Sequence, residues 1–172
     1  MTITAIQKRK RQARYDVYLD GEYFATLSQD AITTHYLKEG DEVEEKAFVE
    51  LVKEAEEQDA VHYVLSALST RAYTRKGAKD KLKEKGFSPS AVAFAIAKME
   101  YYGYIDDDAY CQDYIEECRA TRSTRRIRQD LWEKGIPEAI VDAHLKDNDE
   151  HDACMRSLER RCRGKEIGRA HV

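Results

Sequence analysis

The chain has 172 residues, of which 36% are charged and 42% hydrophobic, and its formal net charge is −4. These values fit one ordinary domain or two or three small helical units with thin cores, and so small a net charge does not by itself indicate a nucleic-acid binder. No apolar stretch approaches membrane-spanning length and no signal-peptide pattern is present, so the sequence predicts a cytoplasmic protein without membrane contact. Charge alternates in blocks of helix length: Arg71–Gly86 holds seven basic and two acidic residues, whereas Glu100–Glu117 holds seven acidic and none basic.

The first thirty residues are predicted to form an antiparallel β extension. Alternating side chains identify three candidate strands: Ile3–Gln7, Tyr15–Leu19 and Glu22–Leu27. Asp20-Gly21, between the last two, is a dipeptide that favours a tight type I′ hairpin. From Ser28 onward the apolar period is helical. Asp41 and Glu44 have the spacing of a helix-capping box, so a helical connector is expected up to residue 58.

After residue 58 the chain repeats itself with an offset of forty-nine residues. Leu82-Lys-Glu-Lys-Gly-Phe87 is followed by Ser-Pro, and Leu131-Trp-Glu-Lys-Gly-Ile136 is followed by Pro137. In both copies the glycine is suited to end one helix and the proline to begin the next. We therefore expect two units of three helices, spanning 60–69, 75–85 and 89–102, then 107–121, 124–134 and 137–146. Because such a unit buries little surface alone, neighbouring units are expected to pack end to end into an elongated, curved array.

The predicted fold is thus mainly α, with tandem three-helix modules behind a small N-terminal antiparallel β extension. The expected divisions are a β extension at 1–30, a helical connector at 31–58, a first module at 59–105, a second module at 106–148, the start of a truncated third module at 149–166, and a non-native tail at 167–172.

No set of residues indicates catalysis or a cofactor. A nucleophile with its base and orienting group is not visible, and the phosphate-binding pattern Gly-x-x-x-x-Gly-Lys does not occur. Asp106, Asp107 and Asp108 could be imagined as a metal cluster, but an N-cap followed by acids in the first turn explains them better. The cysteines Cys111, Cys118, Cys154 and Cys162 contain no Cys-x-x-Cys pair, so reduced, largely buried thiols are favoured over zinc binding.

Five tyrosines occur close together, at Tyr101, Tyr102, Tyr104, Tyr110 and Tyr114. Stacking on nucleic-acid bases is one interpretation. Because the surrounding segment is acidic and would repel a phosphate backbone, core packing at the junction between units is favoured.

Basic side chains gather around the middle helix of each unit. The candidate contact residues are Arg71, Arg75, Lys76, Lys79 and Lys83 in the first unit and Arg122, Arg125, Arg126 and Arg128 in the second. Most of the first set recur at three- and four-residue spacing and therefore share one helix face. The second set crowds the start of a helix, where cations oppose the helix dipole. A solvated polar face would also explain these residues, but their repetition in both units favours a binding surface.

Several of these segments resemble the RecX family, whose members regulate the RecA recombinase. The matching segments are Ala67–Arg71, Leu82–Phe87, Gly103–Asp107 with Tyr110, and Arg126–Ile136, while Ile3–Gly21 is similar to the β extension of one branch of the family. The resemblance implies tandem modules that lie in the groove of a RecA–DNA filament, bridge its protomers, and restrain ATP hydrolysis and strand exchange. The chain departs from the family at Gly77 and Ala78, where an acidic residue and leucine are usual, and in its nearly absent third module.

The expected partners are therefore a RecA filament and, more weakly, single- or double-stranded DNA, bound by a monomer that needs no cofactor or metal. The alternative is a helix-turn-helix transcription regulator in which Arg125, Arg126 and Arg128 enter a major groove. That alternative predicts tight, sequence-selective binding to duplex DNA, whereas filament binding predicts weak and unselective DNA binding.

Overall fold

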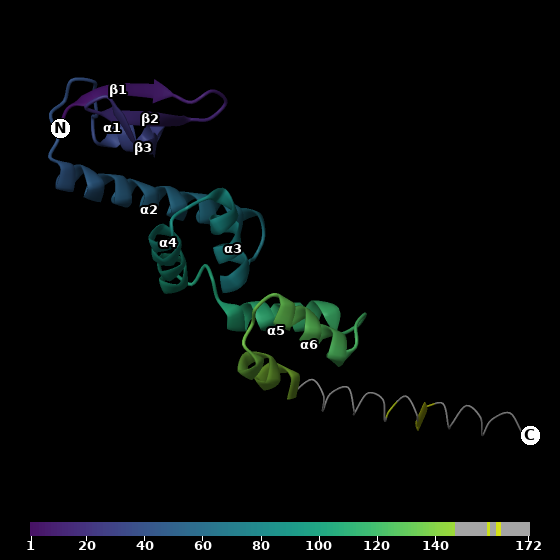
Figure 1. Ribbon diagram of the computed structural model, residues 1–172. Helices are drawn as coiled ribbons and strands as arrows, with labels where there is room; N and C mark the ends of the chain where they lie inside the picture. The colour runs from purple at the N-terminus through teal and green to yellow at the C-terminus, as the bar shows by residue number, and fades with distance from the viewer. Residues whose placement is uncertain (147–157, 159–160, 163–172) are drawn as a thin grey trace, which may run out of the picture. The chain divides into compact units, whose positions relative to one another are not determined.

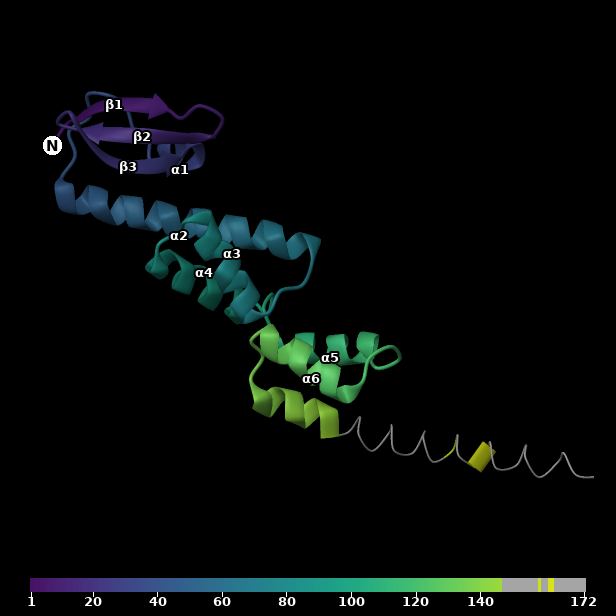
Figure 2. The same ribbon diagram turned by 45° about the vertical axis from the view of Figure 1, so that its right-hand side comes forward.

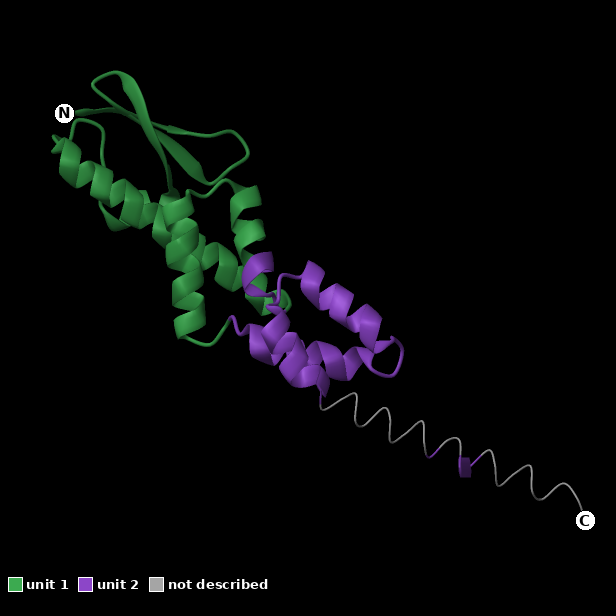
Figure 3. Cartoon of the chain, turned by 60° about the horizontal axis from the view of Figure 1, so that its bottom comes forward, with its two compact units in different colours: residues 1–71, 78–104 green, residues 72–77, 105–172 purple. Residues whose placement is uncertain are grey.

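A computed structural model describes residues 1–146, 158 and 161–162 of the chain. The expectations for a third module at 149–166 and a tail at 167–172 lie outside these residues, apart from positions 158, 161 and 162. The chain divides into two compact units, residues 1–71 with 78–104, and residues 72–77 with 105–172 (Figure 3). No helix in the described part of the chain is both long and apolar enough to span a bilayer.

The first unit begins with a three-stranded antiparallel sheet, as predicted. Its strands β1 (Ile3–Lys8), β2 (Arg14–Leu19) and β3 (Glu22–Ser28) lie in the order β1-β2-β3 (Figure 1). Leu19 pairs directly with Glu22 across the β2–β3 turn. The two turn residues, Asp20 and Gly21, have φ values of 49° and 90°. Because a type I′ turn requires positive φ at both central positions, the predicted hairpin is confirmed.

One face of the sheet packs against helices. Ile3, Val17 and Leu27 form a single buried cluster with Phe48 and Ala55 of the following long helix. Helix α1 (Gln29–Thr34) completes this layer, and the hydroxyl of its N-cap residue Ser28 accepts a hydrogen bond from the Ala31 backbone N–H at 3.2 Å.

The long helix α2 (Glu45–Thr70) differs from the prediction in two respects. The capping box was wrong, since Glu44 is the N-cap without a side-chain hydrogen bond and the Asp41 carboxylate instead accepts from the Lys38 backbone N–H at 2.8 Å. The predicted helix start near Ala60 was also wrong. Residues 45–70 contain neither glycine nor proline, so nothing in this segment interrupts the helix.

Helices α3 (Arg75–Lys85) and α4 (Pro89–Tyr101) follow with nearly the predicted bounds. Helix α4 contacts α2 (Figure 2), and the apolar side chains of this region are buried: Val61, Val64, Leu82, Val92, Ile96 and Met99.

The second unit contains α5 (Asp107–Cys118), α6 (Thr124–Glu133) and a further helical segment at residues 138–146. Its core is one cluster that draws on all three helices: Cys111, Ile115, Cys118, Ile127, Leu131, Ile136, Val141 and Leu145. This core is separate from the cluster beneath the sheet.

The predicted repeat is confirmed at its helix ends and in its core. Gly86 and Gly135 have φ values of 92° and 79°, the left-handed conformation in which glycine ends a helix. In both copies the residue after the glycine donates its N–H to the carbonyl of a leucine, Leu82 at 3.3 Å and Leu131 at 3.1 Å. Both leucine side chains are 0% exposed. The two middle helices therefore end by the same hydrogen bonds over equivalent buried residues.

The tyrosine prediction was wrong for three residues. Tyr101, Tyr102 and Tyr104 are 84%, 60% and 58% exposed. Helix α4 ends at Tyr101 and Gly103 turns the chain with a φ of 74°, so these rings lie beyond the last buried turn of the helix. Only Tyr110 and Tyr114, on α5, pack partly against the core of the second unit.

Candidate functional site

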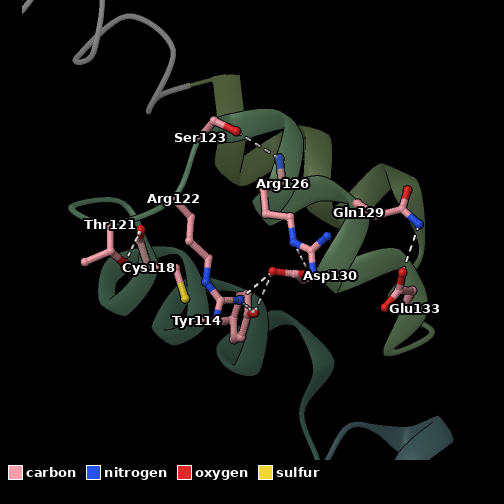
Figure 4. A network of polar contacts seen from close by, with 9 residues as sticks. All are labelled: Tyr114, Cys118, Thr121, Arg122, Ser123, Arg126, Gln129, Asp130 and Glu133. Carbon is pink, nitrogen blue, oxygen red and sulfur yellow. Dashed lines mark hydrogen bonds and ion pairs between the residues drawn. The ribbon is translucent and has the colours of Figure 1, made fainter.

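A buried carboxylate organises the basic residues at the start of α6 (Figure 4). Asp130 is only 7% exposed. It accepts hydrogen bonds from the Arg122 guanidinium at 2.5 Å and the Tyr114 hydroxyl at 3.0 Å, and Arg126 Nε lies 3.0 Å from its other oxygen. Two of the nine candidate cations, Arg122 and Arg126, thus form ion pairs with Asp130.

These contacts determine the ionisation of the network. Burial alone would raise the pKa of Asp130, but the hydrogen bonds from Tyr114 and Arg122 and the charges of Arg126 and Arg122 together lower it below its ordinary value. Burial, together with its hydrogen bond to Asp130, raises the pKa of Tyr114 to about 12. At neutral pH the network therefore holds an ionised carboxylate, a neutral phenol and two guanidinium groups.

The other two arginines of α6 differ from each other. Arg128 is half-buried and forms an ion pair with Asp142, with Glu138 at 4.0 Å. Arg125 is exposed, and no acidic partner for it occurs among the described residues. Of the four predicted arginines between positions 122 and 128, Arg125 is therefore the one whose charge is available to a ligand.

Residues 72–77, which include the start of α3, belong to the second unit and contact the end of α6, an arrangement that sequence reasoning missed. Thr74 Oγ1 donates to the Lys134 carbonyl at 2.8 Å, and Lys76 Nζ donates to the Glu133 carbonyl at 3.1 Å. The Lys76 stem passes over Gly135, where an added Cβ would lie 2.7 Å from Lys76 Cβ. The Lys76 ammonium thus binds the last carbonyl of α6, where a positive charge also interacts favourably with the helix dipole.

The remaining candidates of the first set differ in exposure. Lys79 is half-buried, whereas Arg71, Arg75 and Lys83 are exposed. The Arg75 backbone N–H donates to the Asp107 carboxylate at 2.8 Å, so an acid from the start of α5 caps α3.

Helix α6 also forms one wall of a hollow of about 440 Å³ on the second unit. Its lining comprises Arg125, Arg128, Gln129, Trp132, Ile136, Glu138 and Val141. The Trp132 side chain is 68% exposed, whereas Ile136 and Val141 are 3% and 2% exposed and form an apolar floor. A smaller hollow of about 330 Å³ shares Arg125 and Gln129 and adds Ser123 and Arg126.

Trp132 was not among the predicted site residues, although the repeat offered a signal for it. Its counterpart forty-nine residues earlier is Lys83, a position that faces solvent. A tryptophan in the place of a solvated lysine exposes apolar surface that the core does not require.

The acidic and thiol groups have structural roles where they are described. Asp106 is the N-cap of α5, and its carboxylate accepts from the Asp108 and Ala109 backbone N–H groups at 3.0 and 3.1 Å, as predicted. Cys111 and Cys118 are buried free thiols, and burial raises the pKa of Cys111 to about 11. Within the described residues, no three His, Cys, Asp or Glu side chains are grouped so that they could hold a metal ion.

Comparison with known proteins identifies relatives along most of the chain. Residues 1–44 match the family model of the regulatory protein RecX N-terminal domain, and residues 106–145 match that of the RecX second three-helix domain. A regulatory protein RecX of Caldanaerobacter subterraneus is 33% identical over 85% of this chain and 75% of its own length. One of Clostridium acetobutylicum is 29% identical over 91% and 76%, and one of Levilactobacillus brevis is 30% identical over 83% of this chain but only 54% of its own length.

The solved structures agree with these matches. A crystal structure of a regulatory protein RecX superposes with a TM-score of 0.58 at 30% identity, covering 85% of this chain and 73% of that one. A RecX from Lactobacillus salivarius gives a TM-score of 0.51 at 25% identity over 52% of this chain and 60% of its own. The sheet, the repeated three-helix unit and these likenesses together place the chain in the RecX family of regulatory proteins, whose members modulate the RecA recombinase.

Proposed function

We propose that this chain binds a RecA–DNA filament as a monomer and restrains its ATP hydrolysis and strand exchange. The observation that carries the proposal is the recurrence of one three-helix unit whose middle helix presents an exposed cation in each copy, Lys83 on α3 and Arg125 on α6. Several such weak contacts on a repetitive partner add through multivalency, so none needs to be strong.

Contacts inside the second unit reduce the number of basic residues that are available to bind a partner. Arg122 and Arg126 bind Asp130, and Lys76 binds the Glu133 carbonyl, so reversing any of these charges would disturb the fold as well as a contact. Lys83 and Arg125 are exposed, and substitutions at exposed positions typically change stability by about 0.5 kcal/mol or less. Substitutions at these two residues therefore change binding with little effect on the stability of the fold.

The test compares RecA ATPase activity on single-stranded DNA with increasing amounts of three proteins. The wild-type chain is expected to lower the hydrolysis rate. The double variant Lys83→Glu, Arg125→Glu is expected to require a higher concentration for the same effect, because each reversal replaces attraction to an acidic filament by repulsion. A control with Lys46→Glu and Lys146→Glu has the same net charge but changes exposed lysines outside the candidate set.

A wild-type chain that leaves hydrolysis unchanged would refute the proposed activity. Equal inhibition by the double variant and the control would refute this contact surface. The helix-turn-helix alternative is tested by the same proteins, because it requires selective binding to one duplex sequence and loss of that selectivity in the Arg125 variant. The pairing of Arg122, Arg126 and Arg128 with acids of their own unit leaves few side chains for reading bases, and so argues against that alternative.

A further inference from the structure

The hollow beside Trp132 remains unexplained by the fold. Arg125, Gln129 and Trp132 lie at four- and three-residue spacing along α6 and so share one helix face. They line one hollow together with Ile136 and Val141, which belong to the core of the second unit. A mostly exposed indole beside an apolar floor leaves apolar surface in water without gaining a packing partner, which is typical of a binding surface.

We propose that this hollow binds one unpaired nucleotide of single-stranded DNA, with the base stacked on Trp132 and the phosphate at Arg125. The proposal rests on the proposed function, since it names the part of the filament that this face would contact. It adds Trp132, which is not among the predicted contact residues.

The two adjoining hollows match the two halves of a nucleotide. The larger has an aromatic wall and an apolar floor, whereas the smaller is lined only by polar and charged residues: Ser123, Arg125, Arg126 and Gln129. They share Arg125 and Gln129, so a ligand occupying both must join a flat apolar group to an anion over a short distance. A nucleotide has this composition, and stacking platforms flanked by cations are how proteins bind single strands without sequence preference.

The charge around the smaller hollow favours an anion. Arg122 and Arg126 share the single carboxylate of Asp130, so their pairing leaves one positive charge in excess. Arg125 adds a charge that no acidic group among the described residues balances. Glu138, the acidic residue that lines the larger hollow, lies 4.0 Å from Arg128 and does not line the smaller hollow.

Single-stranded DNA fits this surface better than a duplex does. Bases in a duplex are stacked on their neighbours, so one base could reach the indole only after unstacking at a cost of a few kcal/mol. An unpaired strand carries no such cost, and its backbone is flexible enough to place a phosphate at Arg125.

Trp132 provides its own readout, because it is the only tryptophan in the chain. The experiment titrates the full chain with an oligothymidylate of about ten nucleotides, a length within the site size of about 4–16 nucleotides typical of such surfaces. Tryptophan fluorescence reports stacking, and the anisotropy of a dye on the DNA reports binding independently. An abasic strand of equal length supplies phosphates without bases.

The oligothymidylate is expected to quench Trp132 fluorescence, and the abasic strand to bind more weakly without quenching. Trp132→Ala should weaken oligothymidylate binding by roughly 5- to 150-fold, the range for loss of one base–aromatic stack, and Trp132→Phe should restore part of it. Arg125→Gln should reduce the slope of log affinity against log salt by about 0.7. Arg119→Gln, an exposed arginine of the same unit outside both hollows, should leave binding nearly unchanged.

Unchanged fluorescence at full DNA occupancy, or equal affinity of Trp132→Ala and the wild type, would overturn the proposal. Quenching by RecA protein without DNA, but not by the oligothymidylate, would also overturn it and assign the hollow to a protein segment. The ATPase test separates the two claims. If the wild type inhibits RecA but Trp132→Ala binds the oligothymidylate as tightly as the wild type, the filament function stands and the nucleotide site falls. If the oligothymidylate quenches Trp132 but the wild type leaves RecA hydrolysis unchanged, the nucleotide site stands and the filament function falls.

Discussion

Replacing Gly135 by alanine tests whether Lys76 really lies over the end of α6. Gly135 has a φ of 79°, and an added Cβ would lie 2.4 Å from Lys76 Cδ and 2.7 Å from Lys76 Cβ. The left-handed backbone alone costs an alanine about 1–2 kcal/mol. Crowding against the lysine stem adds roughly 1–3 kcal/mol, as overpacking typically does. We therefore expect Gly135→Ala to lower the free energy of unfolding by about 2–5 kcal/mol in total.

Gly86→Ala is the matched control. Gly86 ends α3 with a φ of 92°, but nothing lies within 4 Å of an added Cβ there. Its expected cost is therefore the backbone share alone, about 1–2 kcal/mol. Urea unfolding measures both variants, with circular dichroism for the whole chain and Trp132 fluorescence as a probe confined to the second unit.

A double-mutant cycle then assigns the difference to Lys76. Lys76→Gly removes the clashing stem, so Gly135→Ala should cost less in that background by about 1–3 kcal/mol. Equal costs for Gly135→Ala and Gly86→Ala, together with a coupling energy of zero, would refute the contact between Lys76 and Gly135. In that case Lys76 would again be a candidate for binding a ligand.

Three further results are expected. Because the pKa of Asp130 is lowered in the folded state, its ionised form stabilises the second unit above a pH of about 4, and this stabilisation is lost as pH falls through the folded pKa. Asp130→Asn should therefore reduce the loss of stability at acid pH, measured by unfolding followed by Trp132 fluorescence. An unchanged dependence of stability on acid pH would contradict the network. Alkylation followed by mass spectrometry should modify the exposed Cys162 quickly and Cys111 only on unfolding, since burial raises the Cys111 pKa to about 11; equal rates would contradict its burial. Leu82→Ala and Leu131→Ala should each lose about 2–5 kcal/mol by urea unfolding, because both side chains are 0% exposed at equivalent positions, and a marked inequality would argue against an equivalent core.

Features that depend on neighbours in the chain could be predicted from the sequence. The Asp20-Gly21 hairpin, the left-handed glycine at position 135 and the Asp106 cap each involve residues within a few positions of one another. Their conformations follow from local sterics and hydrogen bonding, which the residue types specify directly. The repeat was equally visible, because the same caps and core residues recur at a constant offset.

The use of each basic side chain could not be predicted in this way. Helical periodicity places Lys76 and Arg126 on surfaces of their helices, and Arg122 precedes a helix, so from the sequence each has equal claim to be a contact residue. The fold brings Asp130 close to two of them and the end of α6 close to the third. A charge is neutralised by whatever lies within a few ångströms, and only the packing of the helices decides which groups those are.

The same reason separates the aromatic residues. The acidic composition of the tyrosine-rich segment favoured core packing. Tyr104 nevertheless faces solvent, while Tyr114 packs against the core of the second unit and donates a hydrogen bond to Asp130. In the sequence, Trp132 is only one position of the repeat. Its hollow is formed where α6, Ile136 and the helical segment at 138–146 come together. The sequence by itself determined the Asp20-Gly21 turn, the Asp106 cap and the glycine ends of the middle helices, since those conformations are local, but it misplaced the start of α2. Which charges are neutralised and which rings remain exposed was decided by the tertiary structure, because burial depends on residues brought together from distant parts of the chain.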